Sequence, residues 1–362
     1  MSQNSVGRKT SLPHSHFVPY PKNPAAATWL GGWLLTVCFF IAVMIIFGGY
    51  VRLTRSGLSI VEWQVVTGVW PPTSEAAWEA AFEKYRQTPE FRYINSGMTL
   101  AEYKAIYYRE YLHRLLGRLT GLAYMLPLLA FIKSGAISPR QMALYLGIGL
   151  LFALQGLLGW TMVKSGLVDR PLVNHYWLTA HLLLALLLFG GCFWMALDSP
   201  ASGSSRRAGA SPALKLAWGL LAALVLQMAY GGLVAGLKAG AASVTFPLIF
   251  GYLIPPNLWP ASPWPVNLID NPLTTHFIHR WLAFGVLALI IALAYAVGKT
   301  AYPRPVRLGV AILLGLVCLQ IALGISVIIC GVPLWSALAH QANGLAMFAA
   351  ALFVTRQLVR PV

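Results

Sequence analysis

Long apolar runs, separated by shorter polar segments, make up most of the chain. Eight of them are long enough to cross the roughly 30 Å hydrocarbon core of a bilayer as helices. They lie near residues 28–50, 113–132, 142–162, 178–197, 213–236, 276–297, 306–330 and 336–355. The pattern predicts an all-α integral membrane protein with eight transmembrane helices. The composition excludes an ordinary soluble domain, because 58% of the residues are apolar and only 10% are charged.

The net charge of +16 is explained by membrane topology. The basic residues lie at the ends of the apolar runs, and a nucleic-acid surface would need them in one stripe. Those that set the topology are Arg8, Lys9, Lys22, Lys133, Arg140, Arg206, Arg207, Lys215, Lys299, Arg304, Arg307, Arg356 and Arg360. We therefore expect both termini in the cytoplasm and no nucleic-acid partner. The first run lies too far from the N-terminus for a signal peptide, and the tail is no transit peptide, which favours the bacterial inner (plasma) membrane.

The apolar runs repeat a common pattern. Odd-numbered runs end in glycine-rich segments such as "IIFGGYVRLTRSGL" and "QMAYGGLVAGLKAG", whereas each even-numbered run carries a histidine near its start. These histidines are His113, His181, His279 and His340, and their separations are similar in the two halves of the chain. The repeat predicts two four-helix bundles that arose by duplication and are related by a pseudo-twofold axis along the membrane normal. All four histidines should then lie near the outer, periplasmic face.

The polar segments between the runs divide the chain. We expect a cytoplasmic tail at 1–27, an N-terminal half at 28–197 with a long outer loop at 51–112, and a cytoplasmic linker at 198–212. The C-terminal half then covers 213–356, and 357–362 form a second cytoplasmic tail. Within the long outer loop, the run at 74–91 predicts one amphipathic helix that turns Trp78, Phe82 and Tyr85 towards the membrane or the site.

The four repeated histidines are candidate axial ligands of haem iron. A single histidine in an apolar helix is more often a hydrogen-bonded packing residue, but four at repeated positions are unusual, since polar groups inside membrane spans are costly. One turn after each stands a small residue that leaves room for a porphyrin face: Gly117, Ala185, Ala283 and Gly344. The duplication predicts two sites, His113 with His181 and His279 with His340. A copper or dinuclear metal site is less favoured because further ligands are scarce near the histidines. His175 and His276 lack the small residue one turn later.

Glu110 distinguishes the two predicted sites. It precedes His113 by three residues and so shares its helix face, whereas His276 stands at the matching position of the second half. A buried carboxylate there could exchange protons or steady positive charge on a reacting carbon. The alternative is a surface ion pair with Arg109 or Arg114. Candidates for haem propionate contacts are Arg52, Arg55, Arg114 and Arg280, although arginines at such places also extend towards the membrane surface without a ligand.

Four motifs combine the outer loop with the histidine positions: "RLTRSGLSIVEW", "YRQTPEF", "EYLHRLLGRLTG" and "HFIHR". In these motifs the chain resembles the haem A synthase family in its proteobacterial and mitochondrial form. The resemblance implies oxidation of the C8 methyl of haem O to a formyl group by successive hydroxylations, which gives haem A for cytochrome oxidase. It implies that His113 and His181 flank the substrate haem, that His279 and His340 hold a haem B, and that Glu110 is the catalytic glutamate.

The resemblance also implies partners. These are haem O synthase, which is a farnesyltransferase, the cytochrome oxidase assembly machinery, an unidentified electron donor and further copies of the chain. Two other functions stay open on the residues alone. A bis-histidine cytochrome b that carries electrons is disfavoured because both predicted haems lie on one side of the membrane. A haem transfer protein or chaperone would have no need of Glu110.

Overall fold

The computed structural model describes residues 24–64, 67–168, 171–197 and 211–359. Within them, eight helices are long and apolar enough to cross a membrane, which confirms the predicted all-α class and the predicted number of spans. The spanning helices are α1 (Pro24–Leu53), α4 (Leu100–Lys133), α5 (Pro139–Ser165), α6 (His175–Leu197), α7 (Pro212–Gly236), α9 (Pro272–Gly298), α10 (Arg304–Ile329) and α11 (Leu334–Val359). The topology arguments from Arg8, Lys9, Lys22, Arg206, Arg207 and Arg360 fall outside the described residues.

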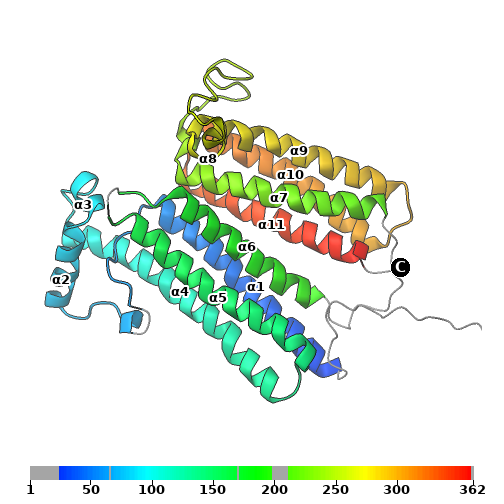
Figure 1. Cartoon of the computed structure of the whole chain (residues 1–362), viewed down its shortest axis with the longest axis horizontal. Helices are drawn as coiled ribbons and strands as arrows, with labels where there is room; N and C mark the ends of the chain where they lie inside the picture. The colour runs from blue at the N-terminus through cyan, green and yellow to red at the C-terminus, as the bar shows by residue number, and fades with distance from the viewer. Residues whose placement is uncertain (1–23, 65–66, 169–170, 198–210, 360–362) are drawn as a thin grey trace, which may run out of the picture.

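The spanning helices form two groups of four. Helices α1, α4, α5 and α6 pack together in one group, and α7, α9, α10 and α11 in the other (Figure 1). Where the groups meet, α6 lies against α7 and α11, and α1 lies against α11. At this junction the ring of Phe348 packs beside Gly190 and faces the ring of Phe189. The arrangement is compatible with the predicted pseudo-twofold relation between the halves.

Polar residues fix where several spans begin. Thr99 and Glu102 form a capping box at the start of α4, and Ser211 accepts a hydrogen bond from the backbone N–H of Leu214 at the start of α7. Asn271 does the same at the start of α9, where Pro272 occupies the first helical position. Such caps satisfy backbone donors that a helix leaves unpaired, and proline fits the first turn because it has no N–H to lose. The caps therefore fix where α4 and α9, which carry His113 and His279, begin.

The long outer loop contains two short helices, α2 (Glu75–Arg86) and α3 (Pro89–Tyr93), and a 3-10 turn, η1 (Thr67–Val69). The prediction of one helix over 74–91 is wrong, because Thr88 caps a new helix that starts at Pro89. The predicted apolar face is buried, but it packs on the first turns of α4. Its residues form an outer-loop cluster of Trp78, Phe82, Tyr85, Tyr103 and Ile106.

Helix α4 makes this packing possible because it starts at Leu100, well before the apolar run begins near 113. His113 consequently lies about 20 Å along α4, while the other three paired histidines lie about 9 to 11 Å from the start of their helices. The extra turns of α4 project beyond the bundle and carry α2 and α3 (Figure 1).

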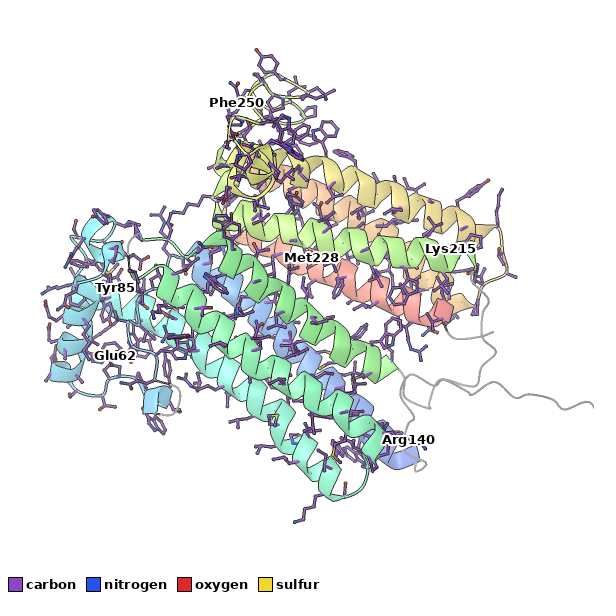
Figure 2. The ribbon with its side chains drawn as sticks, viewed as in Figure 1. Glu62, Tyr85, Arg140, Lys215, Met228 and Phe250 are labelled. Carbon is purple, nitrogen blue, oxygen red and sulfur yellow. The ribbon has the colours of Figure 1, made fainter. Side chains whose placement is uncertain are left out.

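The second long connection joins α7 to α9 and contains η2 (Ala239–Ala241), η3 (Trp264–Val266) and α8 (Asn267–Asp270). Figure 2 shows its tip, marked by Phe250, and the outer loop, marked by Tyr85, at one end of the molecule. Arg140 and Lys215 lie at the other end. The two long connections thus share the end that the sequence predicts to be the outer one.

Candidate active site

Each of the four predicted histidines packs against a glycine of the preceding long helix. A Cβ atom added to the glycine would lie only 3.1–3.3 Å from the imidazole Cε1. Any residue larger than glycine would therefore crowd the histidine ring. The pairs are Gly48 with His113, Gly159 with His181, Gly231 with His279, and Gly324 with His340. The glycine-rich run endings were visible in the sequence, but their contact with the histidines was not predicted.

Three of these histidines also contact a glutamine that the sequence reading overlooked. The amide Nε2 atoms of Gln155, Gln227 and Gln320 lie 3.3 Å from a ring nitrogen of His181, His279 and His340, respectively. Each glutamine precedes its glycine by four residues, which is one helical turn. Glutamine and glycine recur with this spacing in three of the four run endings, and this pattern could have identified the three glutamines from the sequence.

The second histidine pair is spaced to hold an iron. The ring centres of His279 and His340 are 6.3 Å apart, and the ring planes are inclined at 70°. A metal–imidazole bond is about 2 Å long and a ring nitrogen lies about 1 Å from the ring centre, so a metal held between two imidazoles separates their centres by about 6 Å. The buried Nδ1 atom of His340 has no hydrogen-bond partner. The residues present therefore fit a haem whose iron takes two axial imidazoles.

The first pair has the same character. The Nδ1 atoms of His113 and His181 are both buried without a hydrogen-bond partner. A buried polar atom of this kind costs free energy unless a ligand engages the ring. The small residues predicted one turn after the histidines face the neighbouring helix at two places, since a Cβ at Gly117 would lie 3.5 Å from Met44 and one at Gly344 would lie 3.4 Å from Gln320.

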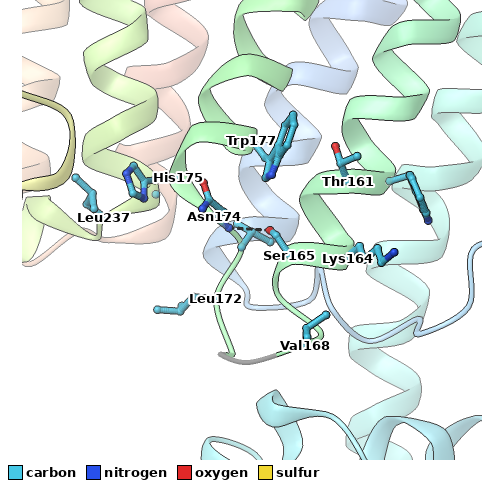
Figure 3. Close-up of a pocket in the computed structure, with 12 residues that line it drawn as sticks. Thr161, Lys164, Ser165, Val168, Leu172, Asn174, His175, Trp177 and Leu237 are labelled. Carbon is cyan, nitrogen blue, oxygen red and sulfur yellow. Dashed lines mark hydrogen bonds between the residues drawn. The ribbon is translucent and has the colours of Figure 1, made fainter. Parts of the chain in front are cut away.

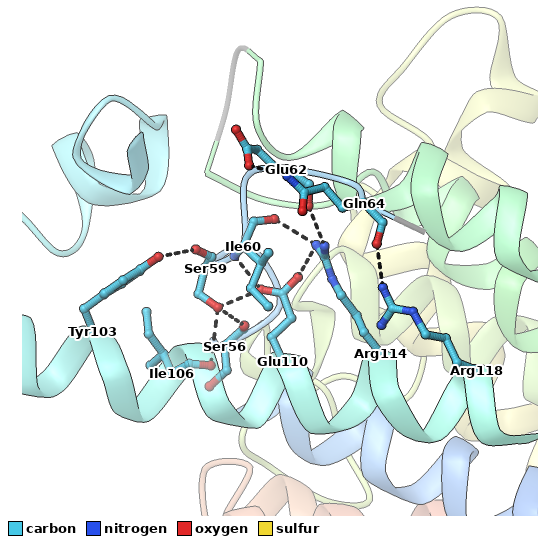
Figure 4. Close-up of polar contacts among 10 residues, drawn as sticks. All are labelled: Ser56, Ser59, Ile60, Glu62, Gln64, Tyr103, Ile106, Glu110, Arg114 and Arg118. Atoms are coloured by element: carbon cyan, nitrogen blue, oxygen red, sulfur yellow. Dashed lines mark hydrogen bonds and ion pairs between the residues drawn. The ribbon is translucent and has the colours of Figure 1, made fainter. Parts of the chain in front are cut away.

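Glu110, which precedes His113 by three residues on α4, lies at the centre of a hydrogen-bond network (Figure 4). Its side chain is almost fully buried, since the residue is 2% exposed. One carboxylate oxygen accepts hydrogen bonds from the Ser59 hydroxyl at 2.7 Å and the Ile60 N–H at 2.9 Å. Arg114 donates to the other oxygen at 2.5 Å, and of the two ion pairs weighed from the sequence this is the one that forms. Three hydrogen-bond donors thus converge on the carboxyl group.

Arg114 extends this network to the loop above. Its guanidinium donates to the carbonyl oxygens of Ile60 and Glu62 at 2.8 and 2.9 Å and lies over the ring of Trp63 at 4.6 Å. The pair of Glu110 and Arg114 therefore ties the segment 59–63 to α4. This segment belongs to the motif "RLTRSGLSIVEW".

The second half repeats this arrangement without an acid. Arg280 follows His279 and donates to the carbonyl oxygens of Thr245 at 2.9 Å and Leu248 at 3.4 Å, both in the second outer connection. Its second terminal nitrogen lies 3.2 Å from the Nε2 atom of His276. Because an arginine can only donate, the His276 ring is the acceptor and is neutral. The Arg280 and His276 pair thus replaces the Arg114 and Glu110 pair, and only the first half has a carboxylate.

The four arginines predicted to contact propionates differ in their surroundings. Arg114 and Arg280 each keep a buried Nε–H without a hydrogen-bond partner, which leaves a donor for an anionic group. Arg52 donates to the carbonyl oxygen of Ala235 and so joins the two halves. Arg55 is exposed and has a positive φ of 50°.

A second buried acid was not singled out from the sequence. Glu90 on α3 is 3% exposed, and burial raises its pKa to about 7, although a hydrogen bond from the Tyr85 hydroxyl works in the opposite direction. Nearby, burial lowers the pKa of Lys238, and the positive charges of Arg55 and Arg52 lower it further. Charged groups from both halves therefore meet at the predicted outer end.

A cavity of about 610 Å³ opens where the ends of α5 and α7 meet the start of α6 (Figure 3). Its lining combines Trp160, Lys164 and Trp177 with His175, for which the sequence offered no role. The Nε2 atom of His175 lies 2.8 Å from a carboxylate oxygen of Asp270, so this pair also joins the two halves. The cavity lining contains none of the four paired histidines.

Comparison with known proteins gives a consistent result along the chain. The model of the family described as "Cytochrome oxidase assembly protein" matches residues 31–352. A protein of Nitrosospira multiformis named "Heme A synthase" is 45% identical over 91% of this chain and 93% of its own length. A protein of the same name from Paramagnetospirillum magneticum is 42% identical over 91% of this chain and 94% of its own length. Another from Rhodospirillum centenum is 38% identical over 97% of this chain and 94% of its own length. The chain therefore belongs to the haem A synthase family of cytochrome oxidase assembly proteins.

Proposed function

We propose that this protein is a haem A synthase, which oxidises the C8 methyl group of haem O to a formyl group and so supplies haem A for cytochrome oxidase. The observation that carries the proposal is the difference between two otherwise similar histidine pairs. Both pairs are seated on glycines, and in each pair one histidine is followed by an arginine that holds an outer loop, but only the first pair has a buried carboxylate beside it. Two haem sites with acid chemistry at one of them suit one reacting haem and one electron-transfer haem.

The histidines have separate tasks in this proposal. His113 and His181 bind and orient haem O, while His279 and His340 hold a haem B. When bound, the haem B supplies one-electron transfer to or from the first site. An electron carrier or a haem chaperone would need no acid at one pair alone, so the buried Glu110 favours the synthase over both alternatives.

Glu110 acts on protons at the substrate edge. Conversion of a methyl to a formyl group removes four electrons and four protons from the methyl carbon and a water molecule, and an external oxidant takes up the electrons. Protons must therefore be transferred at the site as the carbon is oxidised. The carboxylate of Glu110 lies on the same helix face as His113 and can accept such a proton, while Arg114 and Ser59 hold it in place. Arg114 also holds the segment 59–63 against α4.

The proposal also places the protein in the cell. His181, His279 and His340 lie within about two turns of the start of their helices. The two long connections lie at one end of the molecule, and Arg140 and Lys215 lie at the opposite end. By the positive-inside rule this puts both termini in the cytoplasm and the haem sites near the periplasmic side of the bacterial inner membrane. A farnesyltransferase must supply haem O, and the assembly machinery of cytochrome oxidase must take up the haem A.

The test is to express the chain with haem O synthase in a host that makes no haem A, purify it, and separate the extracted haems by chromatography and mass spectrometry. We expect haem B together with haem A or a hydroxylated haem O. Glu110→Gln should lower haem A formation by about 100-fold or more, the range typical for loss of a proton-transfer group, and should leave haem B in place. The exposed Glu79→Gln on α2 is the control and should be fully active.

Haem B alone in the wild-type protein, despite available haem O, would reject the synthase and favour the electron carrier. Haem O that is bound but unchanged, with ready loss to acceptor proteins, would favour the chaperone. Full activity in Glu110→Gln would remove the acid from the mechanism while leaving the synthase intact.

A further inference from the structure

The second long connection carries no charged side chain over most of its length. Residues 239–269 contain no Asp, Glu, Lys, Arg or His, and the run is flanked by Lys238 and Asp270. The outer loop at the corresponding place in the first half is rich in Glu, Lys and Arg. Charged residue types are the ones most often exposed to water. The two connections thus differ in chemistry although they join corresponding helices.

Large apolar side chains of the second long connection are exposed. They include Phe250, Tyr252, Leu253, Ile254, Trp259 and Trp264. The first outer loop is built the other way, since α2 buries Trp78 and Phe82 and exposes Glu79 and Glu83. Single exposed apolar residues are normal, but a group of this size on one segment marks contact with a membrane or with another protein.

The polar side chains at this connection are buried and hold its backbone. The Asn267 side chain accepts a hydrogen bond from the Ala261 N–H at 3.1 Å and donates to the carbonyl oxygens of Ala261 and Trp264, both at 2.9 Å. From the start of α9, the buried Thr274 donates to the carbonyl oxygen of Leu258. The connection is therefore folded with polar groups inside and apolar groups outside, which is the reverse of a loop that faces water.

The tip of the connection is a tight turn beside the bundle. Backbone groups of Ile249 and Tyr252 exchange two hydrogen bonds, at 2.9 and 3.0 Å, around Phe250 and Gly251, whose φ angles are both positive. In Figure 1 this loop stands to the side of α9 near its start, whereas α2 and α3 lie beyond the ends of the spanning helices. The apolar tip therefore lies near the level at which α9 enters the membrane.

We propose that the second long connection is a membrane anchor whose apolar tip lies in the interfacial layer of the leaflet on the predicted outer side. Trp and Tyr favour this layer, and Trp259 and Trp264 stand edge to face there with their ring centres 6.4 Å apart. The interfacial layer suits an irregular segment better than the hydrocarbon core, because its backbone groups still reach water for hydrogen bonds.

Lipid fits this surface better than a protein partner does. Protein interfaces use charged groups, arginine above all, to orient the partners, and none stands between Lys238 and Asp270. A bilayer requires no such groups, and it already covers the spans that the connection joins. The inference holds whether or not the proposed function is correct.

Spin labels measure the depth of single residues in the bilayer. The exposed Cys318 and Cys330 are first replaced by alanine, and the other two cysteines are buried. A label is then attached in Phe250→Cys or in Ile254→Cys, whose native side chain is 68% exposed. The protein is placed in nanodiscs of zwitterionic lipid, and electron paramagnetic resonance follows its collisions with oxygen, which concentrates in lipid, and with a water-soluble nickel chelate.

Two reference positions calibrate the depth. Glu79→Cys on α2 reports water, and Phe284→Cys, at an exposed position midway along α9, reports lipid. Compared with the Glu79 label, both tip labels should collide more with oxygen and less with the nickel chelate. The ratio should place them about 5–10 Å into the boundary between headgroups and acyl chains. The depth should be the same when part of the lipid is anionic, because the connection has no charge.

Three results would overturn the inference. Nickel access at both tip positions equal to that at Glu79 would put the connection in water. Shielding from both agents would show that protein covers the tip. A depth reached only with anionic lipid would show attraction to headgroup charge instead of apolar burial. Each labelled protein must elute like the wild type in gel filtration, and Leu253→Cys replaces either tip variant that does not.

Discussion

Replacing Glu90 by glutamine should remove most of the pH dependence in the stability of the outer-loop cluster. Burial raises the pKa of this carboxyl from 4.5 to about 7 in the folded loop. Each unit corresponds to about 1.4 kcal/mol, so the shift represents roughly 3 kcal/mol. Because the folded-state pKa is raised, the stabilisation is fully present below the unfolded pKa and is lost as the pH rises towards 7. Above that pH the folded loop must hold a buried carboxylate, whereas glutamine stays neutral throughout.

Hydrogen exchange measures this directly. The wild-type and Glu90→Gln proteins are placed in lipid nanodiscs, and the free energy of local opening is followed for the amides of α2 and the first turns of α4 between pH 4 and 8. The wild-type value should fall by roughly 3 kcal/mol across this range relative to the variant. Glu79→Gln, an exposed neighbour on α2, should follow the wild type. Parallel profiles for wild type and Glu90→Gln would refute the reasoning, because the pH dependence would then arise elsewhere.

Two further predictions concern the histidine seats and the junction of the halves. Gly231→Val should displace the His279 ring and abolish haem B binding, as read from the haem content of purified protein, whereas Gly219→Val on the same helix should retain it because nothing lies within 4 Å of that position. Arg52→Gln should lower the free energy of unfolding by about 1.5–3 kcal/mol in a denaturant titration, since it removes a charge-assisted hydrogen bond to a backbone carbonyl of α7. Arg55→Gln, at an exposed residue, should have little effect, and equal losses in both would contradict this role for Arg52.

The eight spans were predictable because the bilayer imposes length and apolarity on each helix separately. The early start of α4 was not, because residues 100–112 carry charges and read as loop. Outside the membrane, such residues form a good helix, and the capping box of Thr99 and Glu102 marks its start. The same reasoning explains the break after Arg86, where a threonine followed by proline starts a new helix.

The histidines were predictable as candidates, but their partners were not. Spacing along one helix decides which residues share a face, and it favours Arg114 over Arg109 as the partner of Glu110, since four residues form one turn. Contacts between helices depend on how far one helix is shifted along another. A sequence does not state this shift, so the seat of each ring on a glycine and the nearby glutamines became visible only in the structure.

Two departures from the common pattern fall beside the same histidine. Met44 replaces a glutamine on α1, and Glu110 stands where the second half has His276. The first difference removes a side-chain amide and the second adds a carboxylate, and both lie beside His113. A duplicated site that only held haem would have no reason to gain an acid beside one ligand alone. A group that moves protons at one of the two haem sites requires this acid, and this is why the first half is the reactive one in our proposal.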